Sequence, residues 1–143
     1  GLEHIVVVGT AQGGANFQLS AQIGSRFPAL ISATGRCIAA YGGYSSAELQ
    51  RRFDLLRWDN PPAYSEWLEQ VAQTRSQGFA TDAGNYIAGV SVIAAAVLKG
   101  ARRPVHALVA VGISGAIERA GMQKIGEDLS AAARSVSERL YAD

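Results

Sequence analysis

Residues 90–111 read VSVIAAAVLKGARRPVHALVAV, and this stretch decides the fold. Its two ends, residues 90–98 and 105–111, are rich in β-branched and small apolar side chains, which is typical of strands. The residues between them, 99–103, include a glycine and basic side chains, which favours a turn. We therefore predict a β-hairpin over residues 90–111.

The segments on either side of this hairpin contain helices and further strands in separate blocks. Downstream, apolar residues recur every three or four positions, which predicts one long amphipathic helix; they are Met122, Ile125, Leu129, Ala132, Val136 and Leu140. Upstream, we predict a strand over 79–82 and three helices, which are 32–41 with a capping hydroxyl at its start, 45 to near 58, and 65 to Gly78. Strands over 5–8 and 17–23 open the chain. Because strands and helices are segregated, the predicted class is α+β with an antiparallel sheet.

A glycine-rich loop, residues 9–14, joins the first two predicted strands. Nucleotide-binding loops also begin with glycines after a strand, but they lead into a helix whose N-terminus faces the phosphate. Here a segment that alternates apolar and polar residues follows instead. We interpret the loop as a hairpin connection, not as a nucleotide site.

Composition limits the classes of protein to which the chain can belong. Its 143 residues are 48% hydrophobic and 17% charged, which predicts one domain, residues 1–143, with its own core. The net charge is +1 and the basic residues form only short clusters, so we expect no DNA binding by this domain itself. A single cysteine and no signal-peptide pattern predict a cytoplasmic setting, and the most apolar run is about half of the ~20 residues that cross a membrane. The abrupt opening suggests a fragment of a longer protein.

The residues that could support catalysis are few. Cys37 with His4 or His106 could form a nucleophile and base, and a small cysteine hydrolase is therefore one alternative. Cys37, however, lies in an alanine-rich predicted helix, where a thiol is more often buried and inert. His106 alternates with apolar neighbours on a strand and is expected either to face solvent or to have its hydrogen bonds satisfied in place. Two histidines and one cysteine at unrelated spacings predict no metal site, and we expect neither a cofactor nor enzymatic activity.

Three motifs in order along the chain resemble a known family. The first is residues 24–28, Gly-Ser-Arg-Phe-Pro, followed by a helix-opening signature made of Ala33, Gly35, Arg36, Ile38 and Ala40. The second is residues 75–82, Arg-Ser-Gln-Gly-Phe-Ala-Thr-Asp, with Gly89 at the expected distance. The third is a closing strand, residues 107–112, before the long C-terminal helix. Together they resemble the effector-binding domain of IclR-type transcription regulators over nearly the whole chain.

This resemblance implies a GAF-like fold, in which a curved antiparallel sheet is flanked by helices and holds a small-molecule effector. It also implies an N-terminal winged helix-turn-helix domain, absent here, through which alone the parent protein binds DNA. Members form homodimers or tetramers, and the aromatic side chains that could supply an interface, or instead pack in the core, are Tyr41, Tyr44, Trp58, Tyr64 and Trp67. The alternative is a GAF- or PAS-like sensory module of another signalling protein.

The predicted binding residues surround the start of the helix over 32–41. Ser32, Ala33, Thr34 and Gly35 would present backbone N–H groups and the positive end of the helix dipole to a carboxylate, although on the residues alone Ser32 or Thr34 could simply cap the helix. Gly35, without a side chain, would let a ligand approach the backbone. The resemblance favours the binding role.

Four further residues complete the predicted site. The resemblance places Asp82 at the pocket, although a lone carboxylate before Gly84 and Asn85 is also typical of a turn. At the positions of Val92, Val109 and Val111, some family members carry Cys or Ser in contact with a small keto acid. Valines there predict a more apolar effector, an aromatic or branched carboxylic acid, or else ordinary core packing.

Overall fold

The fold is that of a computed structural model, which describes residues 4–6, 26–99 and 103–141. Its elements, in chain order, are β1 (His4–Val6), β2 (Arg26–Pro28), α1 (Ser32–Tyr41), α2 (Ser46–Asp54), α3 (Tyr64–Gln77), β3 (Ala80–Ala83), β4 (Val90–Lys99), β5 (Arg103–Ile113), α4 (Ser114–Ala120) and α5 (Met122–Tyr141).

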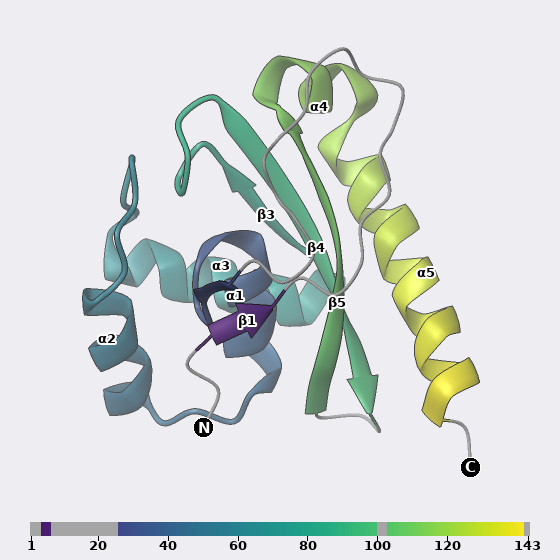
Figure 1. Cartoon of the computed structure of the whole chain (residues 1–143), viewed down its shortest axis with the longest axis horizontal. Helices are drawn as coiled ribbons and strands as arrows, with labels where there is room; N and C mark the ends of the chain where they lie inside the picture. Colours follow the sequence, from purple (N-terminus) through teal and green to yellow (C-terminus); the bar gives the residue numbers. More distant parts are fainter. Residues whose placement is uncertain (1–3, 7–25, 100–102, 142–143) are drawn as a thin grey trace.

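The main sheet of the described residues has the strand order β3-β4-β5, with both pairs antiparallel (Figure 1). The β4–β5 pair is the hairpin that the sequence predicts; β4 is one residue longer than expected at its end, and β5 is longer by two residues at both ends. β1 pairs antiparallel with β2, placing His4 opposite Pro28. The strand predicted over 17–23 lies outside the described residues.

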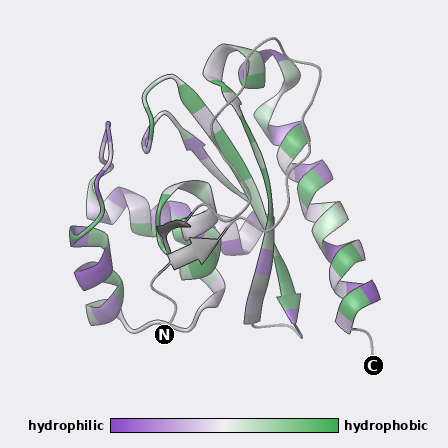
Figure 2. Cartoon of the chain, in the orientation of Figure 1, coloured by the Kyte–Doolittle hydropathy of each residue, from purple (hydrophilic) through white to green (hydrophobic). Residues whose placement is uncertain are grey.

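Helices cover the two faces of this sheet, which confirms the α+β class and the GAF-like arrangement. Alternate strand residues point to opposite faces. On one face, Ala80, Val92 and Ala94 pack with Ala33 and Cys37 of α1. On the other face, the buried β4 residues Ile93, Ala95 and Val97 pack with Phe79 and with the inner side of α5. Figure 2 shows hydrophobic residues along β4 and repeating along α5.

The helix boundaries follow local signals closely, with two differences. The Ser45 hydroxyl caps α2 by accepting the Glu48 N–H, and Gly78 ends α3 in the left-handed region at φ 92°. The second predicted helix was expected to continue to near residue 58, but α2 ends at Asp54. The sequence also missed α4, because Ser114 and Gly115 at its start have low helix propensity.

The aromatic residues that were considered for an interface lie mainly in the core. Trp67 is completely buried, so of its two possible roles the structure favours packing in the core. Phe53 packs against Trp58, Tyr64 and Trp67 with ring centroids 5.2–6.1 Å apart. The other candidates, Tyr41, Tyr44, Trp58 and Tyr64, are partly buried around this cluster. α1, α2 and α3 therefore share an aromatic core that stabilises the α1 side of the sheet.

Candidate functional site

The first turn of α1 differs from the capped start that the sequence predicts. Ile31 is the N-cap residue and makes no side-chain cap, so the expected capping by Ser32 or Thr34 is wrong. Ser32 is instead the first residue of the helix and has a left-handed backbone, with φ 60°. The first N–H groups of a helix have no intrahelical partner, and the N-cap side chain of α1 does not satisfy them. The turn therefore retains its capacity to bind an acceptor.

Gly35 allows α1 to pack closely against the backbone of Leu30. A Cβ atom at this position would lie 1.9 Å from the carbonyl carbon of Leu30, so only glycine fits against that backbone. The Gly35 N–H donates to the Ile31 carbonyl oxygen at 2.8 Å. Ser32, Ala33 and Gly35 are buried, whereas Thr34 is partly exposed. The glycine thus holds the turn tightly against the preceding chain.

Asp82 lies on β3 with its side chain 1% exposed and faces α1. Its Oδ2 accepts the Ser32 hydroxyl at 2.7 Å and the Tyr86 N–H at 3.2 Å. Its Oδ1 accepts the Asn85 N–H at 2.7 Å. Asp82 thus joins the first turn of α1 to the turn that follows β3.

Arg36, one helical turn after Ser32, provides the positive charge of this site and is completely buried. Its Nη1 lies 3.8 Å from Asp82 Oδ2 and has no hydrogen-bond partner among the described residues. Its Nε donates to Gln70 Oε1 and its Nη2 to Asn85 Oδ1, each at 2.9 Å. Burial lowers the pKa of Arg36, while the nearby charge of Asp82 opposes that shift. The guanidinium stays protonated and neutralises the buried carboxylate.

The three valines share the α1 face of the sheet but differ in burial. Val92 of β4 pairs with Asp82 of β3 and with Val111 of β5. Ala94, two residues further along β4, pairs with Val109 of β5. Val92 is 8% exposed and packs with α1, whereas Val109 is 42% and Val111 46% exposed. The structure therefore brings Ser32, Ala33, Asp82 and Val92 together and leaves an apolar strip on β5 beside them.

Sequence reasoning missed two polar residues of this site, Gln70 and Asn85. Gln70 lies on α3, and Asn85 lies in the loop after β3, 34 and 49 residues from their common partner Arg36. Hydrogen bonds between residues so far apart in the sequence leave no local sequence pattern.

The thiol and the imidazole show no catalytic arrangement. Cys37 is 1% exposed, its Sγ donates to the Ala94 carbonyl oxygen at 3.3 Å, and burial raises its pKa to about 12. The His106 side chain is exposed. Within the described parts of the chain, no group of three or more potential ligand side chains could hold a metal ion. Cys37 thus behaves as a core residue.

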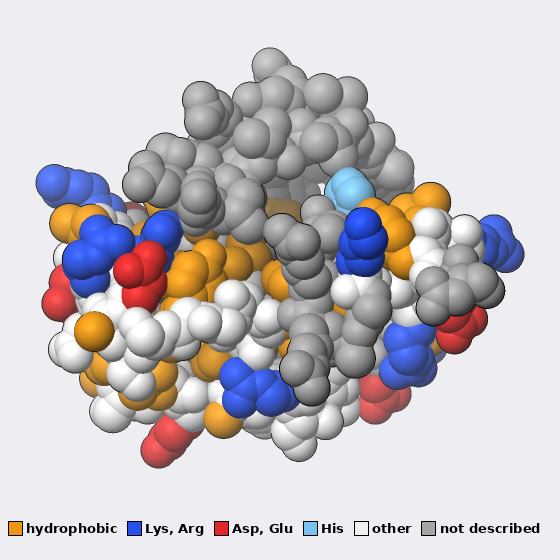
Figure 3. All heavy atoms as spheres, turned by 90° about the horizontal axis from the view of Figure 1, so that it is seen from below, with side chains coloured by type: hydrophobic (Ala, Val, Ile, Leu, Met, Phe, Trp, Pro, Cys, Tyr) orange, Lys and Arg blue, Asp and Glu red, His pale blue; other side chains and the backbone are white. Residues whose placement is uncertain are grey.

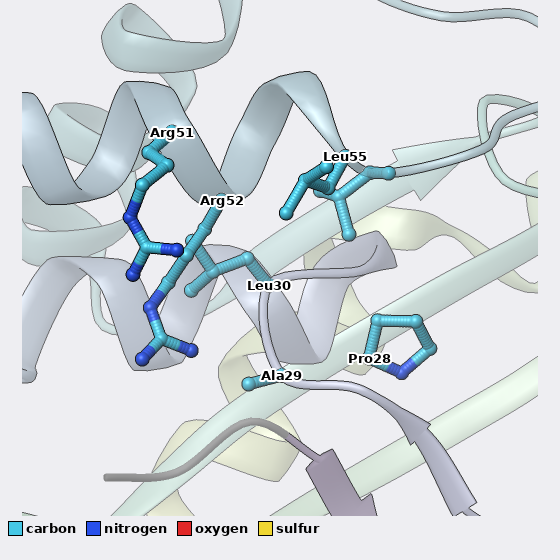
Figure 4. A pocket seen from close by; sticks show the side chains of 7 residues that line it. Pro28, Ala29, Leu30, Arg51, Arg52 and Leu55 are labelled. Atoms are coloured by element: carbon cyan, nitrogen blue, oxygen red, sulfur yellow. The ribbon is translucent and has the colours of Figure 1, made fainter.

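A groove of about 290 Å³ lies elsewhere, between the β2–α1 connection and α2 (Figure 4). Its lining consists of Pro28, Ala29, Leu30, Arg51, Arg52, Leu55 and Leu56. Glu48 forms ion pairs with both of its arginines. The groove contains none of the predicted binding residues, and it serves below as a control surface.

Comparison with known proteins identifies the family. Residues 2–138 match the family described as bacterial transcriptional regulator IclR C-terminal. The chain belongs to the IclR family. This match confirms the resemblance and favours a regulator over the cysteine hydrolase and over a sensory module of another signalling protein, because IclR proteins are transcriptional regulators and not enzymes. A comparison with curated proteins gave no match.

Several solved structures have the same fold. The Agrobacterium tumefaciens repressor BlcR superimposes with a TM-score of 0.81 at 23% identity, covering 99% of this chain and 57% of its own. Thermotoga maritima IclR gives 0.79 at 15% identity, covering 96% and 57%. Pseudomonas aeruginosa HmgR gives 0.74 at 24% identity, covering 96% and 55%. The IclR domain described here therefore spans a little over half the length of these proteins.

Two surface properties complete the description. None of the helices in the described ranges is long and apolar enough to cross a membrane. On the face shown in Figure 3, Lys and Arg side chains are scattered among other side chains instead of forming one dense patch.

Proposed function

We propose that this IclR domain binds a small carboxylic acid, aromatic or branched, between the first turn of α1 and the valine strip of β4 and β5. Binding would regulate DNA binding by a domain that precedes this one in the parent protein. The observation that carries the proposal is the uncapped N-terminus of α1, directly beside a strip of apolar side chains.

The electrostatics of the turn suit an anionic ligand group. The N-terminus of a helix has about half a positive charge and N–H groups that can bind a carboxylate. Thr34 is the partly exposed residue of the turn, and its neighbour Ala33 packs with Val92. Arg36 neutralises Asp82, which would otherwise repel a second carboxylate nearby. A ligand carboxylate therefore fits best at the backbone of Ala33 and Thr34.

The apolar side of the site determines the rest of the ligand. Val109 and Val111 offer exposed aliphatic surface and no hydrogen-bonding side-chain atom. A keto-acid oxygen placed there would lose its bonds to water without gaining a partner, whereas an aromatic ring or branched alkyl group would be stabilised by burial. We therefore expect discrimination in favour of the larger, more apolar acids.

The remaining partners follow from the family and are part of the same proposal. A homodimer or tetramer of the parent protein would place its DNA-binding domains in pairs. A ligand changes such an assembly only through its different affinities for two arrangements. The proposed setting is the cytoplasm.

Isothermal titration calorimetry with benzoate, benzamide and glyoxylate tests the proposed ligand class. Benzoate should bind more tightly than its neutral isostere benzamide by about 2- to 30-fold, the range expected for a charge at a helix N-terminus. Val111→Asp should abolish benzoate binding through like-charge repulsion, while the isosteric Val111→Thr should weaken it only modestly. Leu55→Ser, in the groove beside α2, should leave binding unchanged. Tight glyoxylate binding without benzoate binding would overturn the proposed ligand class.

A further inference from the structure

Two surface loops are joined to each other by hydrogen bonds near the α1 end of the sheet. They are residues 57–63, between α2 and α3, and residues 84–89, between β3 and β4, and we call them the loop pair. The two loops lie side by side at the upper left of Figure 1. The Asn60 N–H donates to the Asn85 carbonyl oxygen at 2.9 Å, and the Asn85 side chain donates to the Asn60 carbonyl oxygen at 3.0 Å. Asp59 accepts the Ala88 N–H at 2.8 Å, so the loops form one unit.

Asn85 connects this unit to the buried ion pair. Its N–H donates to Asp82 Oδ1 at 2.7 Å, and its side-chain oxygen accepts Arg36 Nη2 at 2.9 Å. Arg36 also lies 5.7 Å from the centre of the Trp58 ring, so it contacts the first loop directly. Both loops therefore contact the guanidinium group of Arg36.

The ion pair is equally connected to the binding turn. Asp82 Oδ2 accepts the Ser32 hydroxyl and the Tyr86 N–H, so one oxygen atom joins α1 to the loop after β3. Ser32 has a left-handed backbone that a residue with a side chain rarely adopts, and its surroundings must hold it there. Ser32 and the loop pair therefore share Asp82 as a common hydrogen-bond partner.

We propose that Arg36 is a positioning residue that couples ligand occupancy at the first turn of α1 to the loop pair, through Asp82 and Asn85. This inference rests on the proposed function for its ligand, whereas the coupling itself is a property of the free protein. Arg36 does not contact the ligand. It fixes Asp82 relative to Asn85, so that the turn and the loops change together.

Hydrogen exchange measured by mass spectrometry tests the coupling without any ligand. Ser32→Ala removes one hydroxyl from the turn and should raise the exchange rates of the loop-pair amides about fivefold, as expected for the loss of one hydrogen bond. The matched control is Ser130→Ala, which removes a buried hydroxyl on α5. It should leave the loop pair unchanged. Equal effects of the two variants, or none from Ser32→Ala, would overturn the coupling.

Arg36→Lys tests the positioning role, because lysine keeps the charge but lacks the planar fork that binds Gln70 and Asn85. It should raise loop-pair exchange by itself and remove most of the additional effect of Ser32→Ala. If Arg36→Lys does not fold, Gln70→Met, which removes only the acceptor of Arg36 Nε, takes its place. Additive effects of the two substitutions would contradict the role given to Arg36.

Benzoate separates this inference from the proposed function. In the wild-type protein, saturating benzoate should change loop-pair exchange, and Arg36→Lys should reduce that change at equal occupancy measured by calorimetry. Binding without any change in the loop pair would overturn the coupling. Failure of benzoate to bind would overturn only the proposed ligand, because the ligand-free variants still decide the coupling.

Discussion

The Ser32 hydroxyl donates a 2.7 Å hydrogen bond to Asp82 across 50 residues of sequence. The bond joins the first residue of a helix to a strand of the sheet beneath it. Asp82 in turn has its counter-charge on Arg36, which is in the same helix as Ser32. The start of α1 is therefore held to β3 by a buried polar cluster as well as by apolar packing.

Removal of either charge of this cluster should destabilise the protein strongly. Asp82→Ala or Arg36→Met leaves one buried charge uncompensated, and each is expected to lower the free energy of unfolding by about 3–5 kcal/mol. The double variant should lose clearly less than the sum, since neither charge then remains. Urea denaturation of the wild type, the two single variants and the double variant measures this double-mutant cycle. Strictly additive losses would show that the two charges do not interact.

Gly35→Ala should destabilise the protein through direct overlap. The added methyl group would meet the Leu30 backbone, which cannot move without displacing the turn, so we expect a loss of about 1–3 kcal/mol or more. Gly115→Ala is the matched control, because its Cβ would meet only the flexible end of Arg119 at 3.4 Å. That variant should be neutral or slightly stabilising. Thermal unfolding compares them, and an unchanged Tm for Gly35→Ala would contradict the close packing.

Cys37 should give stability a specific alkaline pH dependence. Its pKa is raised from 9.0 to about 12 by burial, so between these values the unfolded chain loses a proton that the folded chain retains. Stability is then fully present below pH 9 and falls as pH rises, by at most about 1.4 kcal/mol per pH unit. Cys37→Ser, which does not titrate and can keep the bond to Ala94, should lack this component.

Denaturation of the wild type and Cys37→Ser between pH 8 and about 11 measures the difference. Identical pH profiles would mean that the thiol is not buried as described. Iodoacetamide provides an independent check, because the native thiol should react far more slowly than the thiol of the unfolded chain.

Substitutions of Trp67 distinguish a role in the core from a role at an oligomer interface. Trp67→Ala should cost about 3–5 kcal/mol, the range for removing a buried large aromatic side chain. Trp67→Phe should cost much less, because the indole N–H has no hydrogen-bond partner among the described residues and the ring contact with Phe53 is kept. The control Leu55→Ala, at a 73% exposed position, should stay within about 0.5 kcal/mol. Loss of oligomerisation at unchanged stability would instead assign Trp67 to an interface.

The sequence predicted best the elements whose signals are local. The β4–β5 hairpin, the end of α3 at Gly78 and the whole of α5 each follow from a run, a glycine or a period within the element. α4 has only seven residues, none of them buried, and so shows no such pattern. The burial of Trp67 depends on three helices meeting, which no single segment reveals.

For the site, the sequence identified the turn and Asp82 but not what lies between them. Ser32 and Thr34 have the composition of capping residues, yet tertiary contacts place Ser32 inside the helix and direct its hydroxyl to Asp82. The partners of Arg36 on α3 and in the loop after β3 come from distant parts of the chain. The three valines, chosen from the family resemblance, lie on one face of the sheet, but the sequence did not distinguish buried Val92 from exposed Val111.

The close contact between Phe79 and Gly126 restricts the movement of α5 on its side of the sheet. A Cβ atom at Gly126 would lie 2.3 Å from the Phe79 ring, so the ring sits directly on the backbone of α5, and Gly78 meets Ser130 in the same way. α5 can therefore neither slide nor rotate without a steric clash. α5 is therefore fixed against this side of the sheet, and any conformational change caused by the proposed ligand would have to occur on the α1 side.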